Sequence, residues 1–179
     1  MVFVYLLIVV LSLTTAKSFR SWVAYRLGDP TPKNLGRLTI NPAAHIDFFS
    51  TVLSPFLLLI LTSGLLTIGF AKPLSLSPYR FKNPRKGMRL VSLSEPLINL
   101  TIALVFLIFL KTGFPFLSDM MIFIAWTNFI LAMFNLIPVP PLEGANLLAS
   151  FLPKKSANEF LKARSFGFVL ILFLFLTGV

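Results

Sequence analysis

Residues 91–110 read VSLSEPLINLTIALVFLIFL, an apolar stretch that contains one charged residue, Glu95. Twenty residues of α-helix extend about 30 Å, which matches the hydrocarbon thickness of a lipid bilayer. The stretch therefore predicts a membrane-spanning helix. The composition agrees, because 56% of the 179 residues are hydrophobic and only 12% are charged, against about 25% charged residues in a soluble domain. The chain contains no cysteine, which excludes disulfides and thiolate metal sites.

Four more apolar stretches are candidate spans. Residues 117–137 are long enough to cross a bilayer, and residues 51–70 are also long enough but are interrupted by proline and glycine. Residues 2–16 are short, but a helix that continues to about Tyr25 would cross. Since no basic residue precedes this first stretch, we expect a retained span rather than a cleaved signal peptide. Residues 165–179 form a short fifth candidate.

The basic residues lie in the connections between these stretches. Five fall in residues 17–50, six in 71–89 and four in 138–165, whereas the remaining connection holds only Lys111. If residues 51–70 enter and leave the membrane on the same side, fifteen basic residues are cytoplasmic, as the positive-inside rule favours. A full crossing by this segment is the alternative. The formal charge of +10 then indicates attraction to membrane lipid headgroups, and not to nucleic acid, because the chain has no soluble basic face.

Two short segments have the pattern of extended strands. Residues 38–40 (LTI) lie between a glycine and an Asn-Pro pair, and residues 74–76 (LSL) alternate with period two between prolines. We expect them to pair as a small β-hairpin or sheet at the membrane face. The predicted fold is an all-α polytopic membrane protein with four to five hydrophobic segments and this small sheet, and residues 1–179 form a single membrane domain.

The segment FNLIPVPPLEG at 134–144 ends the fourth apolar stretch. Its three prolines break a helix, and Glu143 follows them, just before Gly144. Unwound backbone at membrane depth usually lines a cavity, and an acidic residue there is a functional candidate. The other interpretation is a helix stop in which Glu143 caps the next short helix. The residues by themselves leave both interpretations open.

His45 is the single histidine of the chain, and Asp47 follows it in a region rich in glycine and proline. A lone histidine beside an aspartate is more often a hydrogen-bonded structural residue than a metal ligand. We therefore expect a structural role for His45.

Seven short motifs follow one another along nearly the whole chain. They are AYRLGD at 24–29, NP at 41–42, HID at 45–47, GFAKP at 69–73, NPR at 83–85, Pro96 with Asn99, and NLIPVPPL at 135–142. In this order and spacing they resemble the site-2 protease family of intramembrane zinc metalloproteases, in particular its compact prokaryotic branch without a PDZ domain. The resemblance implies the membrane-embedded core of that family and a location in the plasma membrane of a prokaryote.

The family binds zinc through an H-E-x-x-H motif on its first core helix, where two histidines on one helix face hold the metal and the glutamate acts as general base. Counting back from Ala24 places the two histidines at Ala16 and Arg20 and the glutamate at Lys17. An alanine, a guanidinium and an ammonium group offer no electron pair to a metal. The remaining ligand position falls on Glu143, where the family usually has aspartate. Because catalytic zinc typically takes three protein ligands, we expect no cofactor.

A second family motif, A-G-P-x-x-N, reads SEPLIN at 94–99, with Glu95 in place of glycine. We predict that Lys17 and Arg20 pair with Glu95 or Glu143. Two cations would then fill the space that the metal leaves and neutralise the acidic residues.

The resemblance and the lost motif together predict a site-2-protease-like membrane protein without peptidase activity. Such a protein would regulate or scaffold other proteins by binding their single transmembrane segments in the former substrate groove, with the predicted strands at its edge. The residues expected at this groove are Asn99, Asn135, Pro138, Pro140, Pro141 and Gly144. One alternative is an active metalloendopeptidase with an atypical metal site formed by His45, Asp47 and Glu143. The other is an accessory subunit of a membrane complex.

Overall fold

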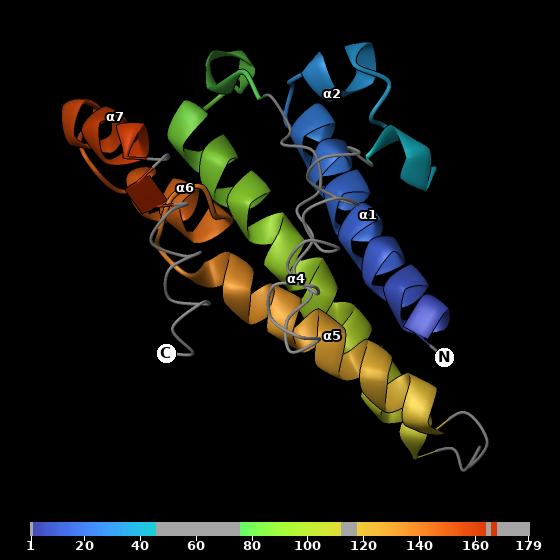
Figure 1. Cartoon of the computed structure of the whole chain (residues 1–179). Coiled ribbons are helices and arrows are strands. Elements are labelled where there is room, and N and C mark those ends of the chain that lie inside the picture. Colours follow the sequence, from blue (N-terminus) through green and yellow to red (C-terminus); the bar gives the residue numbers. More distant parts are fainter. Residues whose placement is uncertain (1, 46–75, 112–117, 164–165, 168–179) are drawn as a thin grey trace.

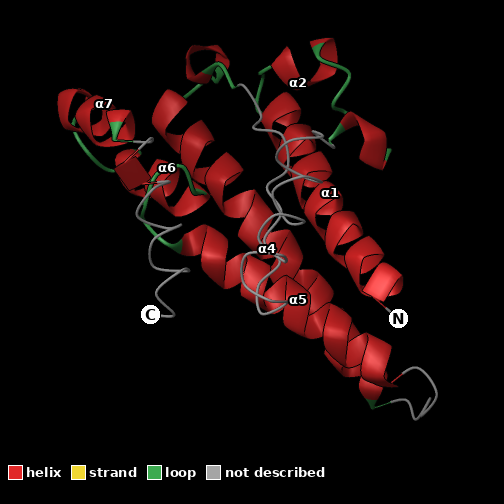
Figure 2. Cartoon of the chain, viewed as in Figure 1, coloured by secondary structure: helices red, strands yellow, loops and turns green. Residues whose placement is uncertain are grey.

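The computed structural model describes residues 2–45, 76–111, 118–163 and 166–167. Every regular element in these ranges is helical, as Figure 2 shows. The elements are α1 (Val2–Arg26), α2 (Thr31–Asn34), η1 (Pro42–Ala44), η3 (Pro78–Arg80), α4 (Pro84–Leu110), α5 (Ser118–Leu136), α6 (Glu143–Ala149) and α7 (Lys154–Lys162), where η marks a short 3-10 helix.

Three of these helices are long and apolar enough to cross a membrane, namely α1 over Phe3–Arg26, α4 over Pro84–Leu110 and α5 over Ser118–Leu136. The predicted helices at residues 91–110 and 117–137 are thus confirmed, and so is the continuation of the first helix to about Tyr25. Residues 51–70 and nearly all of 165–179 lie outside the described residues. The fourth and fifth segments, and the re-entry of residues 51–70, stay predictions.

α4 is the central helix, and it packs along α5 and against α1 and α6. It begins at Asn83, whose side chain accepts a hydrogen bond from the backbone N–H of Lys86 at 3.1 Å, and Pro84 occupies a first-turn position where its missing N–H is not needed. Small residues, among them Ala103 on α4 and Ala125 on α5, are buried. Small side chains allow helices in a membrane to approach closely.

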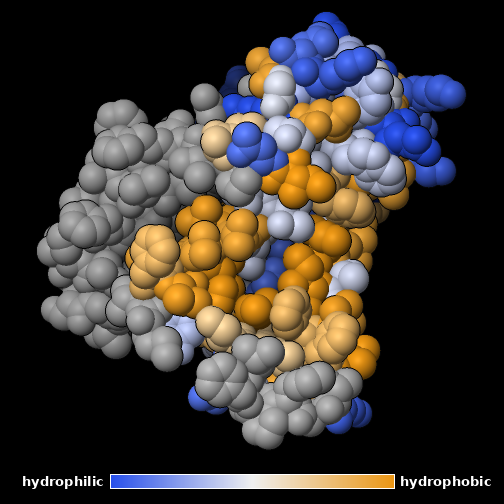
Figure 3. Space-filling model, turned by 90° about the vertical axis from the view of Figure 1, so that its right-hand side faces the viewer, coloured by the Kyte–Doolittle hydropathy of each residue, from blue (hydrophilic) through white to orange (hydrophobic). Residues whose placement is uncertain are grey.

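The short helices gather at one end of the three-helix bundle. In Figure 1, α2, η1, η3, α6 and α7 all lie towards the upper end, where α1 finishes, α4 begins and α5 leads into α6. We call this the basic end, because the described parts of the three basic connections lie there, while α4 finishes before Lys111 at the opposite end. Figure 3 shows hydrophilic surface gathered at the basic end and an apolar belt across the middle of the molecule.

The predicted sheet is not present among the residues that the structure describes. Residues 38–40 form a bend, so the prediction of a strand there is wrong, and residues 74–75 of its predicted partner lie outside the described ranges. A strand does not form at residues 38–40 because side chains already bind the Thr39 carbonyl oxygen, which a strand would need as a hydrogen-bond acceptor. The Thr39 carbonyl oxygen accepts a hydrogen bond from the Ser18 hydroxyl at 2.8 Å and lies 3.0 Å from His45 Nε2, whereas a ladder would require that carbonyl to face a neighbouring strand.

Candidate functional site

The three α1 residues at the positions of the family's metal motif lie at the interior of the bundle. Ala16 and Arg20 are one helical turn apart, so they share a face of α1, and they are 2% and 4% exposed. The Lys17 side chain is 16% exposed. Because α1 packs against α4, this face points towards the helix that carries Glu95.

Glu95 accepts hydrogen bonds from both cations of α1. Its side chain is 1% exposed, and Lys17 Nζ lies 2.7 Å from Oε1 and 2.9 Å from Oε2. Arg20 Nη1 lies 3.3 Å from Oε1 of the same carboxylate. The predicted pairing of Lys17 and Arg20 with Glu95 is therefore confirmed.

Arg20 also joins Glu95 to a second carboxylate. Arg20 Nη1 lies 2.7 Å from Glu143 Oε1, and the other oxygen, Oε2, accepts a hydrogen bond from Asn146 Nδ2 at 3.2 Å. Lys17, Arg20, Glu95 and Glu143 form what we call the ion-pair cluster, which holds two positive and two negative groups. An unpaired ion at this depth would be strongly destabilising because it has lost its hydration. Hydrogen-bonded contact between opposite charges compensates for that loss.

The proline-rich turn after α5 brings Glu143 to this cluster. The chain turns through a cis peptide bond between Pro140 and Pro141 before α6 begins at Glu143. The buried Gly144 lies against the backbone carbonyl groups at the end of α5, and a Cβ atom at this position would overlap the Leu136 carbonyl oxygen. Glycine at this position therefore lets α6 fold back against α5.

Glu143 does not cap α6. The residue at the N-cap is Leu142, which makes no side-chain cap hydrogen bond, and Glu143 is the first residue of the helix. The interpretation of Glu143 as a helix cap is thus wrong. Its carboxylate pairs with Arg20 instead.

Comparisons with known proteins agree with this arrangement of motifs. The model of the family described as peptidase family M50 matches residues 111–176. A Bacillus subtilis (strain 168) protein named "Putative zinc metalloprotease YwhC" is 34% identical over an aligned length of 179 residues. The alignment covers 94% of this chain and 78% of that relative. The chain belongs to peptidase family M50, the site-2 protease family. No solved structure matches it.

The donor set at this place does not fit the zinc ion of the M50 family. Lys17 and Arg20 are cations without a free electron pair, and Ala16 has no donor atom. The two carboxylates are held by these cations, with Glu95 bound to both and Glu143 bound to Arg20. In the part of the chain that the structure describes, no three His, Cys, Asp or Glu side chains come together in a way that could hold a metal.

His45 is buried and makes polar contacts within the protein. The side chain is 2% exposed, and its Nε2 atom lies 3.0 Å from Ser18 Oγ and 3.0 Å from the Thr39 carbonyl oxygen. Both contacts join His45 to other parts of the chain, as in a hydrogen-bonded structural histidine. Asp47, the next residue of the atypical metal site considered above, lies outside the described residues.

The predicted groove residues differ in their burial and in their surroundings. Asn99 is 0% exposed, and neither its Oδ1 nor its Nδ2 atom has a hydrogen-bond partner among the described residues. Pro140 and Pro141 line a cavity of about 110 Å³ together with residues of α6 and α7, whereas Pro138 is exposed and Asn135 is half-buried. The turn that follows α5 thus borders a small cavity, as unwound backbone at membrane depth usually does.

The sequence alone did not single out Asn128, a buried polar residue. Asn128 on α5 is 0% exposed and donates hydrogen bonds from Nδ2 to Ser12 Oγ on α1 and to the Ile124 carbonyl oxygen, each at 2.9 Å. Its Oδ1 atom has no partner among the described residues. An asparagine inside an apolar span was itself a signal, because polar side chains in membrane helices usually face a partner.

Proposed function

We propose that this M50 protein does not cleave peptide bonds and instead binds transmembrane segments of other membrane proteins as a regulator or scaffold. One observation carries the first half of the proposal. Of the three positions at which the family's metal ligands fall, Ala16 has no donor atom, Arg20 is a cation, and Glu143 is bound to that cation.

The energetics argue against an exchange of this cluster for a metal. Taking one partner away from a buried ion pair costs about 3–5 kcal/mol, because the other charge stays buried without compensation. A zinc ion at Glu143 would displace Arg20 from that carboxylate. The guanidinium of Arg20 would then lie beside a dication, with Glu95 as its remaining negative partner. Catalytic zinc further needs protein ligands and an open position for water, and the described donors supply neither.

Buried polar atoms without partners support the binding half of the proposal. Asn99 has an unsatisfied donor and acceptor, and Arg20 Nε and Asn128 Oδ1 also lack partners among the described residues. An unsatisfied buried polar atom costs about 1–3 kcal/mol, so such atoms favour a bound polar group. The backbone of an unwound transmembrane segment offers both donors and acceptors. Figure 3 also shows a hollow in the apolar belt with hydrophilic surface inside it.

Since residues 38–40 form no strand, we place the binding edge at the turn of residues 138–141 alone. The proposed location is the plasma membrane of a prokaryote, with the basic end in the cytoplasm. An accessory role in a larger membrane complex would use the same surfaces.

The proposal that the protein does not cleave peptide bonds is tested on purified full-length protein. We expect less than one tenth of a zinc ion per chain by metal analysis, and no cleavage of single-pass membrane substrates in proteoliposomes. Stoichiometric zinc together with cleavage of a peptide bond within the bilayer would overturn the proposal.

A restored variant provides the positive control for this experiment. It combines Ala16→His, Lys17→Glu, Arg20→His, Glu95→Gly and Glu143→Asp. The Glu95 change is required because Glu95 loses both of its cations when Lys17 and Arg20 are replaced. The variant should bind one zinc ion per chain, and its chelator-sensitive cleavage would show that the substrate and the membrane are suitable.

The binding half is tested by photo-crosslinking. A photo-crosslinking residue in place of Ile137, which is 40% exposed beside the turn, should capture single-pass membrane proteins, and Asn99→Leu should weaken the capture. The matched control is the same residue in place of Ile108, which is 65% exposed on α4. Equal capture of the same proteins at both positions would contradict a specific groove.

A further inference from the structure

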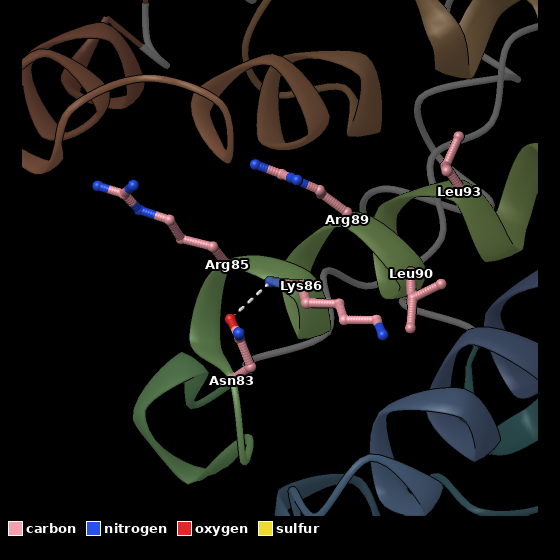
Figure 4. A pocket seen from close by; sticks show the side chains of 6 residues that line it. All are labelled: Asn83, Arg85, Lys86, Arg89, Leu90 and Leu93. Carbon is pink, nitrogen blue, oxygen red and sulfur yellow. Dashed lines mark hydrogen bonds between the residues drawn. The ribbon is translucent and has the colours of Figure 1, made fainter.

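We propose that a pocket at the start of α4 binds the phosphate headgroup of an anionic phospholipid. The pocket has a volume of about 570 Å³ and is separate from the ion-pair cluster. Figure 4 shows the six described residues that line it, which are Asn83, Arg85, Lys86, Arg89, Leu90 and Leu93. This inference does not depend on whether the protein is a peptidase.

The residues at the start of α4 give the pocket an uncompensated positive charge. Three of its six lining residues are basic and none is acidic. Arg85 and Lys86 are exposed, and neither side chain has a hydrogen bond or ion pair within the described ranges. Three cations close to the N-terminus of a long helix favour a bound anion, because the helix dipole is positive at that end. Figure 4 shows that Lys86 extends to the opposite side of α4 from Arg85 and Arg89.

Arg89 is fixed in place by neighbours that leave most of its donors free. Its Nε and Nη2 atoms donate to Ser150 Oγ and to the Ser150 carbonyl oxygen, each at 3.2 Å. The guanidinium also lies over the Phe151 ring, with Cζ 4.0 Å from the ring centroid. A guanidinium has five N–H donors, so the remaining ones are available to phosphate oxygens. Figure 4 shows Arg85 and Arg89 extending to the same side of α4.

Two leucines also line the pocket, and this apolar part distinguishes a lipid from a free phosphate ion. Leu90 and Leu93 follow the basic residues one to two turns further along α4, and Figure 4 shows Leu90 beside Lys86. Leu90 is 43% exposed. A diacyl phospholipid carries an anionic phosphate next to its acyl chains, so it offers a partner both to the basic residues and to the leucines of the pocket.

The length of α4 places this pocket at the correct depth. Its 27 residues extend about 40 Å, close to the bilayer thickness of about 40–45 Å with headgroups included. The 21 residues from Leu90 to Leu110 extend about 31 Å and cover the hydrocarbon. Residues 84–89 then lie in the headgroup layer, where a lipid phosphate is available without any search in solution.

The test uses the full-length protein in nonionic detergent and native mass spectrometry. Phosphatidylglycerol and phosphatidylcholine are added separately, and inorganic phosphate and glycerol phosphate are added as competitors. The test variant combines Arg85→Gln and Lys86→Gln, two exposed side chains whose loss breaks no described contact. The matched control combines Lys155→Gln and Lys162→Gln, which removes two exposed charges from α7.

We expect the wild type to retain phosphatidylglycerol in preference to phosphatidylcholine. The pocket variant should lose affinity by about thirtyfold, because each basic residue near a membrane surface contributes about a fivefold factor. The control variant should change by less than about threefold. Equal losses in both variants would overturn the proposal in favour of a general charge effect. Competition by inorganic phosphate at the same concentration as the lipid would overturn the assignment to a lipid.

Discussion

At the scale of single residues, Arg20 is the centre of the interior. Its guanidinium contacts the carboxylates of Glu95 and Glu143, which come from α4 and α6. One side chain of α1 thereby ties together three helices that are far apart in sequence. A positive group at this position stabilises the fold only because both acidic partners are present.

Replacing Arg20 should therefore destabilise the protein severely. We expect Arg20→Gln to lower the free energy of unfolding by about 3–5 kcal/mol, since two buried carboxylates lose their shared partner. Arg20→Lys should recover part of the loss, because an ammonium restores the charge but not the planar set of donors. Thermal unfolding in detergent measures both effects.

The control for this series is Lys82→Gln, an exposed residue at the basic end, which should leave the unfolding temperature unchanged. A similar unfolding temperature for Arg20→Gln and Lys82→Gln would show that the cluster contributes nothing to stability.

The sequence predicted these residue contacts only where the resemblance to the family brought positions together. The family's motifs place Lys17 and Arg20 near Glu95 and Glu143, so the partners of the two cations could be named in advance. The hydrogen bond from Asn128 to Ser12 and the contacts of His45 with Ser18 and Thr39 could not. Neutral polar groups have many candidate partners, and helix rotation selects among them.

At the scale of elements, the turn between α5 and α6 sets the position of Glu143. Gly144 allows α6 to lie directly against the carbonyl groups that end α5. A helix that started further away would carry Glu143 out of reach of Arg20, with which it now makes a contact of 2.7 Å.

Gly144→Ala should consequently destabilise the protein by about 1–3 kcal/mol, the usual cost of forcing an extra methyl group into a packed site. Its effect and that of Glu143→Gln should be less than additive, because a displaced α6 has already weakened the contact with Arg20. Unfolding measurements on the two single variants and the double variant test this. Leu148→Ala, an exposed change on the same helix, serves as the control, and full additivity would contradict the proposed coupling.

Long elements were predictable and short ones were not. The helices α1, α4 and α5 follow from uninterrupted apolar stretches, since a bilayer leaves a backbone few other conformations. Thr39 and Ile40 have β-branched side chains, and turn residues flank residues 38–40. However, two side chains from other parts of the chain contact the carbonyl oxygen of Thr39. Three residues have too little intrinsic preference to withstand such contacts.

At the scale of the whole molecule, the basic residues of the connections are concentrated at one end of the bundle. The described parts of the connections before and after residues 46–75 both lie at the basic end, and Lys111 follows α4 at the other end. A helix bundle with this distribution is expected to orient its basic end to the cytoplasm.

Single-cysteine labelling tests this orientation, and the natural absence of cysteine makes each introduced thiol unique. In intact cells a membrane-impermeant maleimide should label Lys111→Cys and should not label Lys82→Cys or Lys155→Cys. All three should react after the membrane is permeabilised. Labelling of Lys82→Cys in intact cells would show that residues 51–70 do not return the chain to the side assigned here.

The mutual neutralisation of Lys17, Arg20, Glu95 and Glu143 also constrains how the lineage can change. Any single substitution of Lys17 or Arg20 leaves a buried carboxylate with fewer positive partners than it has now. Each such change therefore costs stability on its own. Compensating changes at two or more of these four positions have to occur together if the interior is to stay neutral.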